Sequence, residues 1–329
     1  MLIRKNAYFD AFRCIAGSCP DSCCQEWDVA VDEDAAAYYR SLPGELGDRL
    51  RQKLKQEDGW YLEITDRRCP MWRGDGLCQI QFELGEGALC KTCREFPRLT
   101  HDYGDFVEYG LELSCPEAAR ILLTAPARPA VEGEAPGGET PEYDAEIMDI
   151  LLRTRRQALA LLEQHPVPQA LQLLLLYGYR VQDELDGGEA VAFDAEAELA
   201  FARQMAQPGT AEDLRGFYLS LELLTERWEN RLRNPQPLTR WPEEIRALAR
   251  YGIERYWLQA VSDFDLICRV KLILSACILI KNLGGDPVAT AQLWSKEIEN
   301  SAENVDTILD AAYTHPALTD VRLLGLLER

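Results

Sequence analysis

Beyond residue 142, apolar residues recur every three or four positions over long stretches of the chain. That spacing puts them on one side of a helix, so it predicts amphipathic helices. The clearest stretches cover residues 144–164, closed by Pro166 and Pro168, and 169–185, closed by Gly187 and Gly188, followed by 211–233 and 263–283. No long alternating run separates these stretches. We therefore expect residues 143–329 to form an α-helical bundle or an array of helical hairpins.

Residues 1–124 show shorter and more varied patterns. Apolar and polar residues alternate over 27–31, 60–64 and 106–113, as in short strands, whereas Asp32 is a plausible N-cap for a helix. We expect residues 1–31 to be a cysteine-bearing loop that ends in a strand. The sequence thus predicts a mainly α protein, with short helices and one or two small β-hairpins in its cysteine-rich N-terminal part.

Residues 125–142 read APARPAVEGEAPGGETPE, a mixture of Pro, Gly and Glu with almost no large apolar residue. Such a composition indicates a linker, and an exposed loop within one domain is the alternative. The predicted organisation is a cysteine-rich domain at 1–124, a linker at 125–142 and a helical domain at 143–329.

The overall charge limits the choice of partners. The 329 residues carry a formal net charge of −20, which argues against nucleic acid, because phosphate binding depends on clusters of Lys and Arg. The longest apolar run, LILSACILI at 272–280, is much shorter than the roughly 20 residues of a spanning helix, so we expect no membrane contact. The N-terminus has no apolar signal-like region, and we expect a cytoplasmic protein.

The cysteines give the strongest indication of what kind of chemistry the protein carries out. Nine of the eleven cysteines lie between positions 14 and 115, in three groups: Cys14, Cys19, Cys23 and Cys24; then Cys69, Cys78, Cys90 and Cys93; then Cys115. The other two, Cys268 and Cys277, lie in an apolar helical pattern and are expected to be buried thiols. Because cytosolic thiols are seldom paired in disulfides, the pattern favours metal binding.

The spacing leaves the identity of the metal open. Cys90 and Cys93 form a C-x2-C pair, which both zinc and iron–sulfur clusters accept. A structural zinc site usually takes two such pairs, and only one is present. Iron–sulfur clusters accept four thiolates at looser spacings. Judged from the spacing alone, a zinc site and an iron–sulfur cluster are about equally well supported. Nine cysteines are more than a single site of either kind requires.

The segments CIAGSCPDSCCQEW, CPMWRGDGLCQIQFELGEGALCKTCREFPR and LELSCPEAARILL resemble the flagellin lysine-N-methylase family in order, spacing and flanking residues. They are more distantly similar to cysteine-cluster proteins described as zinc- or iron-chelating. The resemblance covers roughly the first 125 residues. It implies a cysteine-ligated 4Fe–4S cluster and S-adenosylmethionine-dependent methylation of surface lysines on flagellin, with zinc as the alternative metal. Within that reading we expect Cys69, Cys78, Cys90 and Cys93 as the cluster ligands, and the first group next.

No familiar donor site accompanies this resemblance. The G-x-G-x-x-G turn is absent, and the C-x3-C-x2-C pattern of radical enzymes is incomplete, since Cys24 directly follows Cys23. Candidate catalytic residues come from the polar stretch beside the cysteines. His101, the only histidine near them, is joined by three others, Tyr103, Glu108 and Tyr109. Arg94 and Arg98 flank the second cysteine group and are candidates for binding a cofactor carboxylate or stabilising thiolates, with a surface salt bridge as the alternative.

Three function classes follow from these observations. The resemblance implies a protein-lysine methyltransferase. The cysteines alone are equally consistent with an iron–sulfur redox or electron-transfer module. The third possibility is a helical protein that binds other proteins and whose fold is stabilised by a structural zinc ion.

Overall fold

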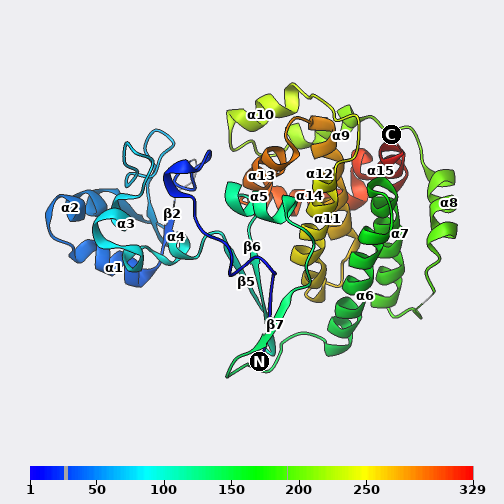
Figure 1. The fold of residues 1–329 in the computed structure, drawn as a ribbon, viewed down its shortest axis with the longest axis horizontal. Coiled ribbons are helices and arrows are strands. Elements are labelled where there is room, and N and C mark those ends of the chain that lie inside the picture. Colours follow the sequence, from blue (N-terminus) through cyan, green and yellow to red (C-terminus); the bar gives the residue numbers. More distant parts are fainter. Residues whose placement is uncertain (26–28, 191, 329) are drawn as a thin grey trace.

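The computed structural model describes residues 1–25, 29–190 and 192–328, and Figure 1 shows a small lobe beside a large helical body. Residues 27 and 28 of the strand predicted at 27–31 lie outside the described residues. The remainder of that strand is present as β2 (Val29–Val31). The predicted mainly α fold is confirmed, with the N-terminal sheets larger than the hairpins we expected.

The small lobe surrounds a three-stranded antiparallel sheet with the order β2-β4-β3. Its core includes the buried side chains of Tyr39, Leu50 and Met71. Asp32 is the N-cap of α1 as predicted, since its carboxylate accepts a hydrogen bond from the Ala35 N–H. The remaining elements are α1 (Glu33–Ser41), α2 (Gly44–Lys53), β3 (Leu54–Gln56), β4 (Trp60–Leu62), α3 (Gln79–Leu84), the 3-10 turn η2 (Glu86–Ala88) and α4 (Lys91–Glu95).

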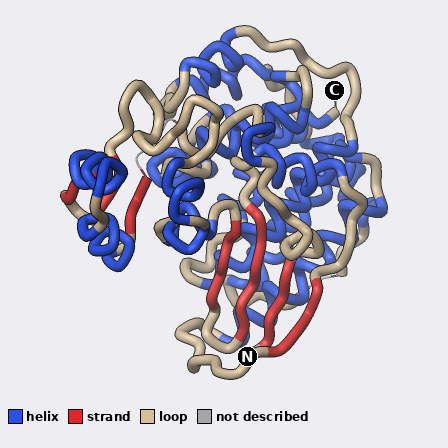
Figure 2. The backbone as a smooth tube through the Cα atoms, turned by 60° about the vertical axis from the view of Figure 1, so that its left-hand side comes forward, coloured by secondary structure: helices blue, strands red, loops and turns tan. Residues whose placement is uncertain are grey.

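A second, four-stranded sheet joins distant parts of the sequence (Figure 2). Its order is β5 (Arg98–Asp102), β6 (Phe106–Leu111), β1 (Leu2–Lys5) and β7 (Val131–Glu134), with β1 parallel to β6 and antiparallel to β7. Two expectations need correction here. The first residues are a strand rather than part of the cysteine loop, and the predicted linker contains β7.

The pattern could not show β7, because all four of its residues are exposed and none is selected for burial. Its backbone instead pairs with the free edge of β1, whose unpaired N–H and C=O groups accept any extended segment beside them.

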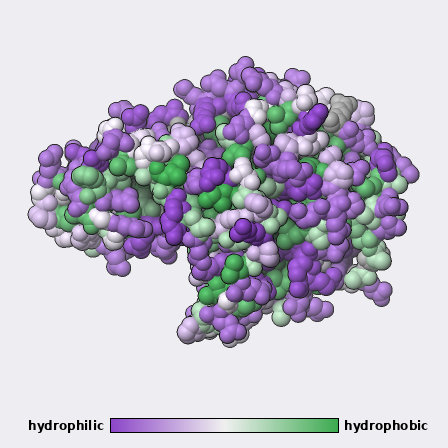
Figure 3. Space-filling view, in the orientation of Figure 1, coloured by the Kyte–Doolittle hydropathy of each residue, from purple (hydrophilic) through white to green (hydrophobic). Residues whose placement is uncertain are grey.

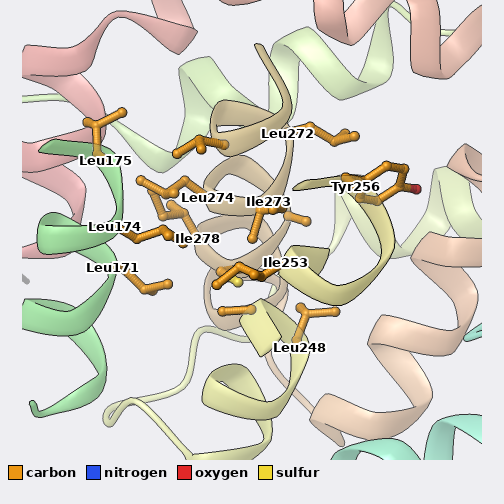
Figure 4. Packing of buried hydrophobic residues seen from close by; sticks show 14 of the residues in the cluster. Leu171, Leu174, Leu175, Leu248, Ile253, Tyr256, Leu272, Ile273, Leu274 and Ile278 are labelled. Atoms are coloured by element: carbon orange, nitrogen blue, oxygen red, sulfur yellow. The ribbon is translucent and has the colours of Figure 1, made fainter. Parts of the chain in front are cut away.

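The helical body is built around α12 (Ile267–Leu283), in which every residue except Asn282 is buried. A helix that is buried on all sides needs neighbours on all sides. Figure 4 shows side chains of α7 and α11 packed against Leu272, Ile273, Leu274 and Ile278 of this helix. Gly252 of α11 allows one close approach, since a Cβ there would lie 2.6 Å from Ile273 Cγ1. Cys268 and Cys277 are buried in α12, as predicted.

The other helices complete the body, some in direct contact with α12 and some outside that layer. They are α5 (Pro116–Thr124), α6 (Ala145–Gln164), α7 (Val167–Leu185), α8 (Ala195–Met205), α9 (Ala211–Leu219), α10 (Glu226–Arg233), α11 (Glu243–Tyr256), α13 (Pro287–Ile298), α14 (Ala302–Thr314) and α15 (Asp320–Leu327), with short 3-10 turns η1 (Ala16–Ser18), η3 (Trp257–Val261) and η4 (Pro316–Leu318). Figure 3 shows mostly hydrophilic residues on the surface, in keeping with the high net charge. Among the described residues, no helix is both long and apolar enough to cross a membrane.

The single helix predicted over 211–233 is wrong, because the chain is interrupted between α9 and α10. The carboxylate of the buried Glu297 accepts hydrogen bonds from the backbone N–H groups of Leu224 and Thr225. Thr225 then caps α10 by accepting from the Trp228 N–H. These tertiary bonds satisfy backbone groups that a continuous helix would otherwise satisfy.

Candidate functional site

A cavity of about 870 Å³ lies where the four-stranded sheet faces α6 and α11. Strands β1, β5 and β6 form one wall, helices α6 and α11 the other, and the chain between α5 and β7 the rim. Its size is within the range of about 300–1,000 Å³ that is typical of sites for small organic ligands. Its lining combines apolar side chains such as Leu99, Leu152 and Leu159 with many charged ones.

An ion pair ties the two walls together. Arg155 of α6 donates to both carboxylate oxygens of Glu108 on β6, at 2.8 and 2.6 Å. Both side chains are only 13% exposed. Two parallel hydrogen bonds fix the direction of both groups, so this pair sets the width and orientation of the cavity.

His101 lies on β5 directly opposite Glu108 in the antiparallel register. Burial lowers the pKa of this imidazole, and the nearby Arg255 guanidinium lowers it further, while Glu108 acts in the opposite direction. A lowered pKa keeps the ring neutral at pH 7. A neutral imidazole lining a cavity can accept a proton from a bound ligand.

Glu254 of α11 is a buried carboxyl group in the same cavity, and it accepts a hydrogen bond from the Asn6 side chain at 3.0 Å. Burial raises its pKa, and the Asn6 hydrogen bond and the charge of Arg155 only partly offset that effect. The cavity therefore holds a proton acceptor and a carboxyl group of raised pKa. Titratable groups whose pKa values are shifted by burial and by neighbouring charges often occur in functional sites.

Behind the cavity wall, a buried carboxylate holds Arg255 in place. Glu299 has no exposed side-chain surface and lies 3.3 Å from the Arg255 Nε. The hydroxyl groups of Tyr251 and Tyr256 also donate to Glu299. This network orients the guanidinium that influences His101.

Three of the four predicted catalytic residues, His101, Glu108 and Tyr109, line the cavity. Tyr103 does not, because its ring stacks on Phe106 with centroids 4.7 Å apart and packs against the core of the body. Neither predicted cofactor arginine is part of the lining. Arg94 donates to the Leu89 carbonyl, and the Arg98 guanidinium lies over the rings of Phe9 and Phe12.

Sequence reasoning missed Arg155, Glu254 and Arg255. Each lies in an ordinary amphipathic helix, where a charged residue is most often part of the solvated face. Only the packing of α6 and α11 beside the sheet, which no local pattern indicates, brings these helix positions into the same cavity as His101.

The cysteines of the small lobe gather in its core. Cys69 and Cys90 are buried there, and three more, Cys24, Cys78 and Cys93, pack against the same core. The Cys93 thiol donates to the Cys90 sulfur, which lowers the pKa of Cys90 and raises that of Cys93. Burial raises the pKa of Cys69 to about 12, and the negative charges of Cys24, Cys78 and Cys90 add to that effect.

The other four cysteines lie towards the helical body. Burial raises the pKa of Cys115 to about 11, and the nearby thiolates of Cys19 and Cys14 also raise it. The Cys23 thiol donates a hydrogen bond to the Cys24 sulfur, which raises the pKa of Cys23. Burial and the nearby charges of Cys14 and Cys115 also raise this pKa. The nine sulfurs thus divide into two neighbouring groups that meet at Cys23 and Cys24.

In the described part of the chain, no three Cys, His, Asp or Glu side chains converge as the ligands of a single metal ion do. A four-iron cluster has different requirements, because each of its four thiolates binds a separate iron, so the sulfurs stand further apart. Five thiols in one small core provide enough donors of the right chemistry for such a cluster.

Comparisons with known proteins point to one group. The chain is 30% identical over 132 residues to the flagellar biosynthetic protein FliU of Salmonella muenchen, an alignment that covers 38% of this chain and 78% of FliU. The lysine-N-methylases of Salmonella typhimurium and Salmonella choleraesuis match at the same identity and length. The chain spans only 33% of the length of each of these two proteins. No family model and no solved structure matches.

Proposed function

Because this chain belongs to the flagellin lysine-N-methylase family, we propose that it is a protein-lysine N-methyltransferase that takes its methyl group from S-adenosylmethionine and acts on flagellin. We place the reaction in the cavity between the four-stranded sheet and helices α6 and α11. The observation that carries this proposal is the neutral His101, held opposite Glu108 in a cavity large enough for the donor.

Methyl transfer to an amine needs an unprotonated nitrogen in line with the donor methyl group. The lysine nitrogen forms a new bond to the methyl carbon of the donor as the bond between that carbon and the sulfonium sulfur breaks. The sulfur leaves as part of a neutral thioether. His101 accepts the proton that the lysine ammonium loses. Glu108 provides negative charge beside the two cationic reactants, Glu254 provides a carboxyl group of raised pKa, and Tyr109 supplies an aromatic wall.

Two arginines of the lining suit the carboxylate of the donor. Arg128 and Arg156 line the cavity and form no ion pair among the described residues: Arg128 lies over the Tyr8 ring, and Arg156 donates to a backbone carbonyl. A guanidinium without a carboxylate partner is available for a bidentate hydrogen bond to a ligand carboxylate.

We assign the lobe thiols Cys69, Cys78, Cys90 and Cys93 as ligands of a 4Fe–4S cluster, with Cys24 as a fifth thiol beside them. Bound there, the cluster would supply a redox-active centre and brace the lobe. Zinc, the alternative metal, would require these thiols to converge more closely than they do among the described residues. Methylation of flagellin subunits before export would place the protein in the cytoplasm.

The test is to incubate the anaerobically purified protein with flagellin and isotope-labelled donor, and to map modified lysines by mass spectrometry. His101→Asn should lower kcat by roughly 10²–10⁴-fold, the usual contribution of a positioned base. His165→Asn is the matched control, since His165 ends α6 and does not line the cavity. Equal rates for the two variants would remove His101 from the reaction. A wild-type protein with intact metal that methylates no lysine would overturn the proposal in favour of a redox module.

A further inference from the structure

The loop that bears Cys19 and Cys23 is fastened to the helical body through Asp21. The Asp21 carboxylate accepts hydrogen bonds from Lys296 and Gln292 of α13, both at 2.9 Å. Arg227 of α10 lies 3.7 Å from the same carboxylate. Asp21 and Lys296 are 12% and 10% exposed, so this attachment is largely shielded from water.

Gln292 also reaches the segment that bears Cys115. Its side-chain amide donates to the Ser114 carbonyl at 2.7 Å as well as to Asp21. One buried amide therefore holds the Cys19–Cys23 loop beside the residue that precedes Cys115. The two segments are more than 90 positions apart in the sequence.

Cys14 belongs to a third chain segment that packs near Cys115. Phe12, two residues earlier, is buried in a small core with Cys115, Leu111 and Ala118. Cys115 is the N-cap residue of α5, so a rigid element fixes its position. The Cys19 thiol donates to the Asp21 carbonyl and thus belongs to the same fastened loop.

We propose that Cys14, Cys19, Cys23 and Cys115 hold a second iron–sulfur centre, separate from the one assigned to the small lobe. Four thiolates are the complete ligand set of a 4Fe–4S cluster, and here they come from three chain segments that α13 and α5 hold together.

The position of this centre distinguishes it from the centre in the lobe. Leu111 packs with Cys115 on one side and lines the cavity on the other. The second centre thus stands behind the cavity wall, and the lobe centre adjoins it through the consecutive residues Cys23 and Cys24. This inference concerns metal binding alone and does not require that the chain transfers methyl groups.

The test counts metal in anaerobically reconstituted protein. The wild-type chain should hold about eight irons and as many sulfides, the content of two four-iron clusters. Cys115→Ser and Cys19→Ser should each reduce iron to about half and leave the paramagnetic resonance signal of the lobe centre. Cys93→Ser should remove the other half and leave the signal that the first two variants lose.

The control is Cys277→Ser, since this buried thiol of α12 belongs to neither group and its loss should leave the iron count unchanged. Cys19→Ser keeps the inference testable if the buried Cys115 variant fails to fold. A wild-type content of about four irons would overturn the proposal. So would complete loss of iron in Cys19→Ser, full retention of iron in that variant, or zinc in place of iron.

Discussion

The small lobe and the helical body are held together by different means. The body has an extensive core of leucine, isoleucine and tryptophan side chains around α12. Among the residues that the structure describes, the core of the lobe comprises fourteen buried residues, two of which are cysteines, with three further cysteines packed against it. A core of that size seldom stabilises a fold alone, and small domains of this kind commonly rely on metal or disulfides. One chain thus combines a unit that folds by burial with a unit that we expect to need metal.

Removal of the metal should give the largest difference between the two regions. A chelator applied under reducing conditions should abolish most amide protection over residues 29–95, because metal binding and folding are coupled in small thiolate sites. Protection over α7 and α12 should persist, since their burial does not involve the lobe. Hydrogen exchange followed by mass spectrometry measures both regions in one sample. Equal loss of protection in both would show that the body also depends on the metal.

A substitution that leaves a void in the core of the helical body should have the opposite effect. It should destabilise the body and leave the metal content unchanged. Leu274 of α12 is fully buried, and Leu274→Ala should lower the free energy of unfolding by about 2–5 kcal/mol. Iron content should stay at the wild-type level, because no cysteine of the two groups contacts this side chain within the described core. Denaturant titration and metal analysis of the same preparation provide both readings. A substantial loss of iron would contradict the separation of the two regions.

The smallest expected effect concerns Asp32, which connects α1 to the C-x2-C pair. Its carboxylate accepts from the Lys91 N–H and from the Ala35 N–H, and these bonds lower its pKa. Asp32→Ala should cost about 1 kcal/mol, as for the loss of an N-cap. Because the pKa is lower in the folded state, the contribution is present above the ordinary Asp pKa and is lost as pH falls below it.

The pH dependence of that effect separates the cap from mere loss of packing. The difference in unfolding free energy between wild type and Asp32→Ala should be constant near neutral pH and should shrink in acid. Asp34→Ala is a suitable control, since Asp34 lies in the same first turn and makes no cap hydrogen bond. A difference that does not change with pH would contradict the role of the carboxylate charge.

Local sequence allowed prediction of those parts of the site that lie close together in the chain. His101, Glu108 and Tyr109 were predicted because they lie in the polar stretch between Cys93 and Cys115, and a hairpin brings them together. Arg155, Glu254 and Arg255 were not, because their helices reach the site only through packing of α6 and α11 against the sheet. The exposed strand β7 escaped prediction for a similar reason, since pairing with β1, and not hydrophobic periodicity, determines it.

The division of the cysteines also lay beyond the sequence. Spacing separates Cys23 and Cys24 from the second group and leaves Cys115 alone. In the structure, Cys24 joins the lobe core, and Gln292 brings the Ser114–Cys115 segment to the Asp21 loop. A single glutamine on a distant helix carries no signal of that role.

The central claim, that the cavity binds the methyl donor, is tested most directly by calorimetric titration of S-adenosylmethionine. Leu159 of α6 lines the cavity, and Leu159→Trp fills part of it. The same change at Leu84, an exposed residue of the small lobe, is the matched control. We predict saturable binding to the wild type and to Leu84→Trp, with affinity reduced at least roughly tenfold, or about 1.4 kcal/mol, in Leu159→Trp. Equal affinity in all three proteins would contradict this assignment, because the donor would then bind elsewhere.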